Sequence, residues 1–414
     1  MALWLSRIVV IARTDYQACG AGHSVTCTPH SCVIGDLLEM TVQNVLVIGG
    51  GITGTVAAIA LAQKGVKVTM LEIAPQWFGV GHGITVQGNL LKVFKAIGAY
   101  DEIAAKGHTF NNMRLFNADG SPIAEIPIAH TGGDDLPSTM GALRSDLQDV
   151  LVNKFHDLGI EIHLGTTMTS YENKADSIDV TLSDGSVKNF DLVIAADGIK
   201  SPTRKMLGSK HDKKQTGLGI WRVVTKRSPE MDASGMAYGG DEYKAGYTPI
   251  SKDLCYCFVL TQPVRPDNGL TDAQEMKRLL SSYHGDFDFI RENIQEDDYM
   301  NFTPIEWLFI DDEPWHDGRI IAIGDAVHAC PPLIAQGAAQ CSEDAYVLAQ
   351  YVTREGNMEQ LLTDYTNARK ARLKVVVDAS LQLVDWEIHP ETPGANPGAL
   401  MASSLKALAD NPAF

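Results

Sequence analysis

The sequence predicts an α/β fold, and two observations carry that prediction. An apolar strand at 44–48 runs into a glycine-rich turn, followed by an alanine-rich helix at 55–64 and a second strand at 67–71. This order is that of a βαβ unit. The middle third then contains β-like runs separated by Gly/Tyr/Pro-rich turns, and two long helical patterns follow at 338–353 and 358–384. We therefore expect βαβ at the front, a β-rich middle and a helical end.

The remaining helices and strands are predicted from the spacing of apolar residues and from the positions of turn-forming residues. Gly65 fits the position just past a helix end, and Asp184-Gly185 between two alternating runs predicts a hairpin. Further helices are expected at 89–97, 146–158 and 272–280, an alternating region at 113–128, and strands at 160–164, 177–182, 191–195, 221–225, 255–261 and 319–323.

Composition excludes several classes of function. The 414 residues are 45% hydrophobic and 21% charged, with a formal charge of −17. A basic footprint for nucleic acid or an anionic membrane surface is missing, so we expect no nucleic-acid or membrane partner. Seven cysteines with no CxxC pair predict neither a disulfide scaffold nor a metal site. Cys255 and Cys257 share a strand face and should pack as small hydrophobes. No uncharged apolar run of about 18 residues occurs, and we expect an unexported, cytoplasmic protein.

Residues 1–39 differ from the rest of the chain. They hold three of the seven cysteines, lack a clear period and end just before Met40. Regular apolar patterning begins at Asn44. We predict that 1–43 is an N-terminal extension, either poorly structured or packed on the surface.

The strongest local signal is Gly49-x-Gly51-x-x-Gly54 between the first strand and helix, with Glu72 closing the second strand. Gly49 permits a tight turn, Gly51 lets backbone approach a pyrophosphate, and Gly54 lets helix and strand pack closely. A carboxylate at Glu72 can accept ribose hydroxyls. The combination predicts a dinucleotide site, although it does not separate NAD from FAD.

Two further signals lie later in the chain. A strand at 319–323 ends in Gly324-Asp325, followed by Pro331-Pro332 and a helix that begins with small residues. Another buried strand ends in Asp197-Gly198. Asp325 can hold a sugar-alcohol hydroxyl, and the helix start can present N–H groups to a polar ring edge.

Together and in this order, the three signals resemble the FAD-dependent aromatic-ring hydroxylases (group A flavoprotein monooxygenases), the family of p-hydroxybenzoate hydroxylase, salicylate hydroxylase and 6-hydroxynicotinate monooxygenase. The resemblance covers about 44 to 385. It implies FAD as cofactor, NADH or NADPH as co-substrate, and a set of cofactor-binding residues: Gly49, Gly51, Ile52, Thr53 and Gly54 at the diphosphate, Glu72 at the ribose, Gly83 and Arg144 at the flavin, Asp197 and Gly198, Asp325 at the ribityl chain, and Pro332, Gln336 and Gly337 beside the isoalloxazine.

The resemblance also implies an architecture: a Rossmann-like FAD-binding domain of the p-hydroxybenzoate hydroxylase kind with an inserted β-sheet substrate domain and C-terminal helices. We expect the FAD-binding domain to comprise 44–112, 140–208 and 313–385, and the substrate domain 113–139 and 209–312. The last residues, 386–414, are expected to form a C-terminal tail, and the protein to be a monomer or homodimer.

The implied activity is hydroxylation of a phenol-like or hydroxypyridine-like ring with NAD(P)H and O₂ through a flavin C4a-hydroperoxide. The alternative is an FAD-dependent reductase or dehydrogenase without oxygen transfer. Candidate catalytic residues are Arg222, Tyr247 and His328. Strand alternation aims Trp221 and Arg222 at opposite faces, so only one of them can face the substrate. A structural ion pair would explain Arg222 equally well.

Overall fold

The computed structural model describes residues 42–77 and 81–414. Of the expected N-terminal extension, residues 1–41 lie outside the described residues. Met40–Phe414 belong to one unit, and the account below is of that unit.

A mostly parallel sheet carries the glycine-rich turn. Its central strand is apolar and buried over the four residues 45–48 and lies between two parallel neighbours, as expected for a strand buried on both faces. The βαβ unit expected from the sequence is confirmed. In spatial order the strands are β18 (His316–Asp317), β19 (Ile320–Ala322), β12 (Leu192–Ala195), β1 (Asn44–Ile48), β2 (Lys67–Glu72) and β8 (Glu161–Leu164).

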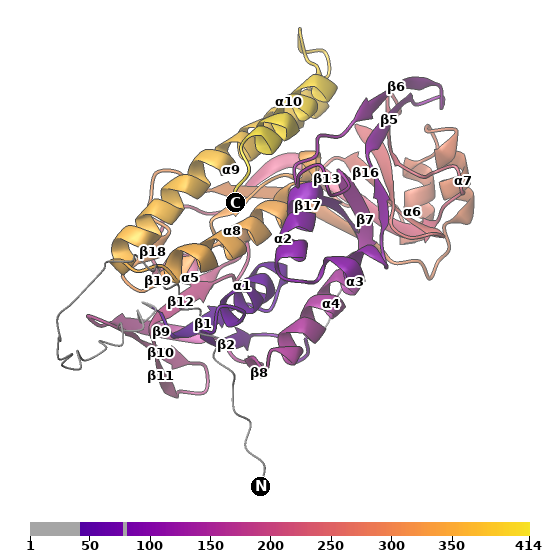
Figure 1. The fold of residues 1–414 in the computed structure, drawn as a ribbon. Coiled ribbons are helices and arrows are strands. Elements are labelled where there is room, and N and C mark those ends of the chain that lie inside the picture. The colour runs from indigo at the N-terminus through magenta and orange to yellow at the C-terminus, as the bar shows by residue number, and fades with distance from the viewer. Residues whose placement is uncertain (1–41, 78–80) are drawn as a thin grey trace, which may run out of the picture. The chain divides into compact units, whose positions relative to one another are not determined.

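Helices cover one face of this sheet and a small meander covers the other (Figure 1). Val45 and Val47 point into the helical side, whereas Leu46 and Ile48 pack toward the meander. The covering helices are α1 (Ile52–Ala62), α2 (Gly88–Ala96), α3 (Tyr100–Ala104), α4 (Arg144–Asp157) and α8 (Gly337–Val352), and the meander comprises β9 (Met168–Asn173), β10 (Ile178–Leu182) and β11 (Val187–Phe190).

A second, larger sheet is built mainly from the middle of the chain. Neighbouring strands are antiparallel except for one parallel pair, β14 with β5. In spatial order its strands are β20 (His328–Ala329), β17 (Met300–Phe309), β13 (Lys214–Lys226), β16 (Leu254–Thr261), β15 (Lys244–Pro249), β14 (Ser234–Tyr238), β5 (Asn112–Asn117) and β6 (Pro122–Pro127).

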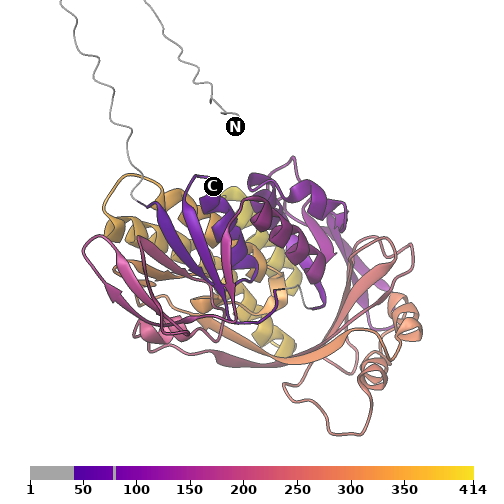
Figure 2. The same ribbon diagram turned by 90° about the horizontal axis from the view of Figure 1, so that it is seen from below.

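The two faces of this second sheet have different neighbours. Helices α6 (Asp272–Leu279) and α7 (Asp286–Asn293) cover its outer face, at the right of Figure 1. Trp221, Cys255 and Cys257 belong to that outer core, so the two cysteines do pack as small hydrophobes. The inner face, with Ile220 and Leu260, packs in part against α9 (Met358–Ile388), and Figure 2 gives a second view of this arrangement.

Shorter elements join the two large sheets. A three-stranded antiparallel sheet in the order β3 (Gly83–Gln87), β7 (Thr139–Leu143) and β4 (His108–Phe110) lies at the junction. The remaining elements are α5 (Pro202–Met206), α10 (Pro397–Asp410) and two single 3₁₀ turns, η1 (Gly324–Ala326) and η2 (Pro332–Ile334).

The expected C-terminal tail is the clearest difference from the sequence analysis. Residues of the predicted tail continue α9 to Ile388 and then form α10. The signals were present: Asn396 caps Ala399, Pro397 occupies the first helical position, and Met401, Leu405 and Leu408 form one buried face. The sequence analysis assigned no helix to 386–414, and the apolar stripe of this helix is stabilised by packing on α9.

Within 42–77 and 81–414, no helix is long and apolar enough to cross a membrane.

Candidate flavin and substrate site

A cavity of about 540 Å³ lies between the glycine-rich turn and the inner face of the eight-stranded sheet. Its volume is in the range of roughly 300–1,000 Å³ that is usual for ligand sites. Its wall contains ten of the predicted site residues: Gly51, Ile52, Thr53, Gly83, Arg144, Gly198, Arg222, Asp325, Pro332 and Gly337. The wall also contains a set of large apolar side chains: Phe110, Met113, Ile128, Ile220, Met236, Phe258, Leu260, Met401 and Leu405.

The glycine-rich turn has the open cradle that a diphosphate requires. Gly49 has a φ of +103°, and a Cβ there would lie 2.4 Å from the Ala196 carbonyl oxygen. A Cβ on Gly54 would lie 1.9 Å from the Gly49 oxygen, whereas one on Gly51 would meet no atom within 4 Å. The turn is therefore closed on the protein side and open on the cavity side. The N-terminus of α1 begins directly at this opening, where it favours negative charge.

Glu72 holds the backbone of this turn. One carboxylate oxygen accepts the Gly50 N–H at 2.7 Å, and the other accepts the Ala74 N–H at 2.8 Å. Trp77 donates its indole N–H to the Gly50 carbonyl at 2.6 Å. Glu72 lies at the end of β2 as predicted, but Gly49, Gly54 and Glu72 are outside the cavity wall. They shape the turn, and Gly51 forms the surface next to the cavity.

The Gly-Asp turn presents a carboxylate to the cavity. Asp325 is exposed there and lies in η1, after a glycine with a φ of +64°. Asp344 fixes this turn from α8: it accepts the Gly324 N–H at 3.0 Å and bonds to His328 Nε2. Sequence reasoning did not identify Asp344, because a single acid within a helix carries no local signal.

His328 is not brought to the cavity. Its side chain is 1% exposed, is held by Asp344 and lies beside the Trp315 ring. Tyr247 is also excluded: it is fully buried on the outer face of the second sheet, where it donates a hydrogen bond of 2.5 Å to Asp286. Strand alternation explains Tyr247, since Lys244 and Thr248, at the even positions of β15, line the cavity instead. The geometry therefore counts against a direct catalytic role for Tyr247 or His328.

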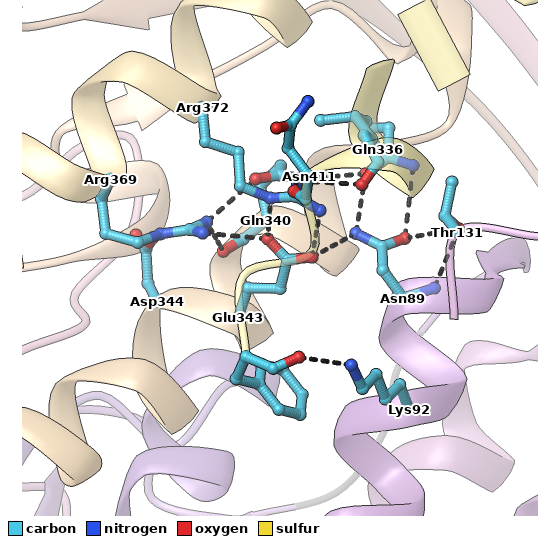
Figure 3. A network of polar contacts seen from close by, with 12 residues as sticks. Asn89, Lys92, Thr131, Gln336, Gln340, Glu343, Asp344, Arg369, Arg372 and Asn411 are labelled. Atoms are coloured by element: carbon cyan, nitrogen blue, oxygen red, sulfur yellow. Dashed lines mark hydrogen bonds and ion pairs between the residues drawn. The ribbon is translucent and has the colours of Figure 1, made fainter. Parts of the chain in front are cut away.

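The loop ahead of α8 combines a cavity wall with a buried anchor. Pro332 and Gly337 line the cavity, and Ala335 between them has a φ of +53°, the only positive φ at a non-glycine position among the described residues. Gln336 was predicted to contact the cofactor, but its side chain is fully buried and accepts hydrogen bonds from Asn89 and Gln340 (Figure 3). The structure places the Gln336 amide behind the loop.

That anchor belongs to a buried network of charges between α2, α8 and α9 (Figure 3). Arg369 donates to Asp344 at 2.6 Å and to Glu343 at 2.9 Å, and Arg372 donates to Glu343 at 2.7 Å. Burial alone would raise the pKa of both carboxyl groups. The neighbouring cations lower it, and the net pKa of Glu343 and of Asp344 is below the usual range. The network is therefore ionised and charge-compensated.

Two of the predicted cofactor residues in the cavity wall have open surroundings, and a third lies beside the wall. Arg144 begins α4 and is exposed there, and Gly198 has a φ of +77° with open space around it. Asp197 is adjacent but outside the wall. One of its oxygens accepts the Thr203 N–H at 3.1 Å, and the other is buried without a hydrogen-bond partner among the described residues.

Arg222 points into the cavity from the inner face of β13, and Trp221 packs on the outer face. Its Nε donates to the Tyr256 hydroxyl at 3.2 Å and one terminal nitrogen donates to the Thr303 hydroxyl at 2.7 Å. Among the described residues, no carboxylate lies within ion-pair distance of Arg222. Since a guanidinium has five N–H donors, three remain for a ligand. The structural ion pair considered from the sequence is absent from this part of the chain.

His82 adds a neutral polar group beside Arg222. Its ring stacks on Tyr256 with 5.6 Å between centroids, and Nδ1 lies 2.8 Å from the Gly83 carbonyl. A carbonyl only accepts, so Nδ1 carries the proton and Nε2 is the acceptor in the neutral ring. Burial, with the positive charges of Arg222 and Arg144, lowers the pKa of His82 to about 4. The ring is thus neutral near pH 7.

The comparisons with known proteins agree with this geometry. Residues 42–380 match the FAD binding domain family. A Bacillus subtilis protein named as an FAD-dependent monooxygenase, YetM, is 32% identical over 359 residues, which cover 85% of this chain and 96% of that protein. The aurachin C monooxygenase/isomerase of Stigmatella aurantiaca is 29% identical over 356 residues, covering 83% and 90%.

Solved structures show the same fold. Klebsiella pneumoniae HpxO, in complex with FAD and uric acid, superposes with a TM-score of 0.73 at 22% identity, covering 89% of this chain and 93% of that one. The open cradle at Gly51 and the exposed Asp325 fit an FAD molecule. The family match spans both of these positions, and the chain belongs to the FAD binding domain family as a flavoprotein monooxygenase.

Proposed function

We propose that the protein hydroxylates a phenol-like or hydroxypyridine-like ring, with NAD(P)H and O₂ as co-substrates. The single observation that carries this proposal is the Arg222 guanidinium, which faces the cavity without a carboxylate partner among the described residues. A cation in that position favours the deprotonated form of a ring hydroxyl, because an opposite charge stabilises the ionised group. A ring activated in this way is electron-rich.

Each neighbouring group has a distinct part in this proposal. Bound FAD supplies the redox and oxygen-activating chemistry. Gly51 and the α1 N-terminus hold its diphosphate, and Asp325 accepts a hydrogen bond from a hydroxyl of its ribityl chain. Arg222 orients the ring oxygen, and neutral His82 accepts a hydrogen bond at Nε2. Phe258 and Leu260 line the cavity with apolar surface and reduce the access of water.

The two large sheets divide these tasks in our proposal. The six-stranded sheet and its helices bind FAD, and the inner face of the eight-stranded sheet binds the ring. This division is supported by the cavity wall, in which the residues from the glycine-rich turn and those from β13, β15 and β16 lie at different places.

Product analysis tests the proposal. The FAD-loaded protein is incubated with NADH or NADPH and a panel of phenol carboxylates, 4-alkylphenols and hydroxypyridines, while oxygen uptake and ring products are measured. We expect at least one compound to yield a product with one added oxygen atom in step with NAD(P)H oxidation. Substrate-dependent oxidation of NAD(P)H that yields a reduced or dehydrogenated product without added oxygen would instead support the reductase or dehydrogenase alternative.

A further inference from the structure

The cavity wall contains a lysine that the proposed function does not use. Lys244 is the first residue of β15, and its side chain is 3% exposed. It lies in the cavity wall, on the same strand face as Thr248. Leu260, the residue opposite it on β16, also lies in that wall.

The ammonium group of Lys244 has one anionic partner. It donates to Glu387, in the last turn of α9, whose side chain is 4% exposed. The Tyr238 ring lies 5.5 Å from the nitrogen and contributes a cation–π contact. Within the part of the chain that the structure describes, Glu387 is the only hydrogen-bond acceptor of this ammonium. An ammonium has three N–H donors, so two have no acceptor among the described residues, and the residue itself forms part of the cavity wall.

The charge of Glu387 determines which kind of ligand group could accept hydrogen bonds from the Lys244 ammonium. Burial lowers the pKa of Lys244, but Glu387 more than offsets this and the net pKa is raised. Lys244 therefore keeps its positive charge beside the Glu387 side chain. A carboxylate placed beside it would be repelled by Glu387, whereas an uncharged oxygen accepts from the ammonium without that repulsion. A hydroxyl or carbonyl oxygen is the best match.

The register of the sheet sets the length of ligand that reaches Lys244. Arg222 lies opposite Phe258, and Phe258 lies opposite Gly246. Lys244 is thus two strands across and two residues along from Arg222, or roughly 12 Å between Cα atoms from standard strand spacings. The inner-face side chains between them are apolar: Ile220, Phe258 and Leu260.

We propose that Lys244 is a specificity-determining residue that binds an uncharged hydroxyl or carbonyl oxygen at the far end of an apolar substituent, carried by the ring that Arg222 orients. This inference rests on the proposed function, because it takes the ring to lie at the Arg222 end. The substrate class is accordingly a phenol or hydroxypyridine with an apolar chain that ends in a neutral oxygen group.

Three matched phenols test this inference by equilibrium dialysis against the FAD-loaded protein: 4-heptylphenol, 4-(6-hydroxyhexyl)phenol and 6-(4-hydroxyphenyl)hexanoic acid. The Lys244→Met/Glu387→Met double variant removes both charges, so neither remains buried and unpaired. We expect the ratio of the dissociation constants of the heptyl and hydroxyhexyl compounds to fall about tenfold in this variant, the loss of one hydrogen bond to a charged donor. Using the ratio cancels the different hydration of the two chains.

Glu387→Gln provides a second, opposite readout. Its amide oxygen still accepts from Lys244, but the repelling charge is gone. Binding of the hexanoic acid is expected to tighten about tenfold, while binding of 4-heptylphenol stays the same. A purely structural ion pair would produce neither change. The control is Lys374→Met/Asp378→Met, which removes an exposed pair on the same helix and should leave all three constants unchanged.

The outcomes separate this inference from the proposed function. An unchanged ratio in the double variant, no gain for the acid in Glu387→Gln, or no binding of the hydroxyhexyl compound to the unaltered protein would overturn the role of Lys244. Product analysis with the same three phenols tests hydroxylation separately. Binding with the expected selectivity but without oxygenated product would leave the Lys244 contact standing and count against the proposed reaction.

Discussion

Arg369 and Arg222 show how differently one side-chain type is used in the two halves of this molecule. Arg369 is fully surrounded: it donates to Asp344, Glu343 and the Gln340 backbone and side chain, and it is 2% exposed. Arg222 donates to two neutral hydroxyls and faces a cavity. The first arginine has its partners within the protein. The second retains donors, and we infer that its anionic partner is a ligand.

This difference has a general lesson for locating sites. Charged side chains mark both regions, Arg369 fully buried and Arg222 half-buried, so charge alone would direct attention equally to the α8–α9 network and to β13. The two regions differ in the number of arginine N–H donors that make no hydrogen bond within the protein. A cation whose donors and charge are already matched inside the protein cannot bind a ligand strongly. Four changes would break or sharpen the comparison.

The largest effect is expected for Arg369→Met. The change leaves two buried carboxylates with fewer cations, and breaking a buried pair in this way costs about 3–5 kcal/mol of folding free energy. Denaturant unfolding followed by circular dichroism measures it. The surface variant Lys374→Ala on the same helix should leave the unfolding midpoint nearly unchanged. Equal destabilisation by both variants would show that the buried network contributes no more to folding free energy than a surface residue does.

Asp325→Ala should affect the cofactor rather than the fold. The carboxylate is exposed at the cavity, and loss of one charge-assisted hydrogen bond to FAD is worth about 1.5–3 kcal/mol, or roughly ten- to hundredfold in affinity. Flavin retained after dialysis, read from absorbance, reports the change. Asp378→Ala on the surface of α9 is the control. Full flavin occupancy in Asp325→Ala would refute the assignment of Asp325 to the ribityl chain.

His82 should make stability depend on pH. Its folded-state pKa of about 4 lies below the ordinary value of 6.5, so between these values the unfolded chain binds a proton that the folded chain does not. Stability therefore falls as pH falls through this window, by about 1–2 kcal/mol after allowance for the part of the ring that water reaches. In His82→Asn this part of the pH dependence should vanish.

Thermal unfolding of the FAD-loaded protein between pH 4 and 7 measures the difference between the unaltered chain and His82→Asn. The exposed ring of His156 offers a matched control, and His156→Asn should keep the original slope. Parallel curves for the unaltered protein and His82→Asn would mean that folding leaves the pKa of His82 at its ordinary value.

The smallest effect is expected for Arg222→Lys, which keeps the charge but loses the second N–H contact of a planar guanidinium. The KM for a phenol that the enzyme accepts should rise roughly fivefold, about 1 kcal/mol, while the flavin spectrum stays unchanged. Arg114→Lys, on the same sheet but outside the cavity wall, is the control. If KM and coupling stay unaltered in Arg222→Lys, the ring oxygen is held elsewhere.

Much of the fold was determined by local sequence. The strand at 44–48, the glycine turn, α1, the 184–185 hairpin and the two long helices α8 and α9 were all predicted within a few residues, because each depends on contacts between near neighbours. The opposite orientation of Trp221 and Arg222 also followed from strand alternation, a property of the backbone alone.

Tertiary structure determined which face of each strand meets the cavity, a choice that strand alternation does not make. The sequence could not say which face of the eight-stranded sheet would meet the cavity, and so Tyr247 was selected and Lys244 was not. Lys244 meets Glu387 across 143 positions of sequence, and Asp344 in α8 reaches back to hold Gly324. Such pairs carry no local pattern, since they exist only after separate sheets and helices have packed together. Sequence determined the elements and their faces, and packing determined which faces form the site.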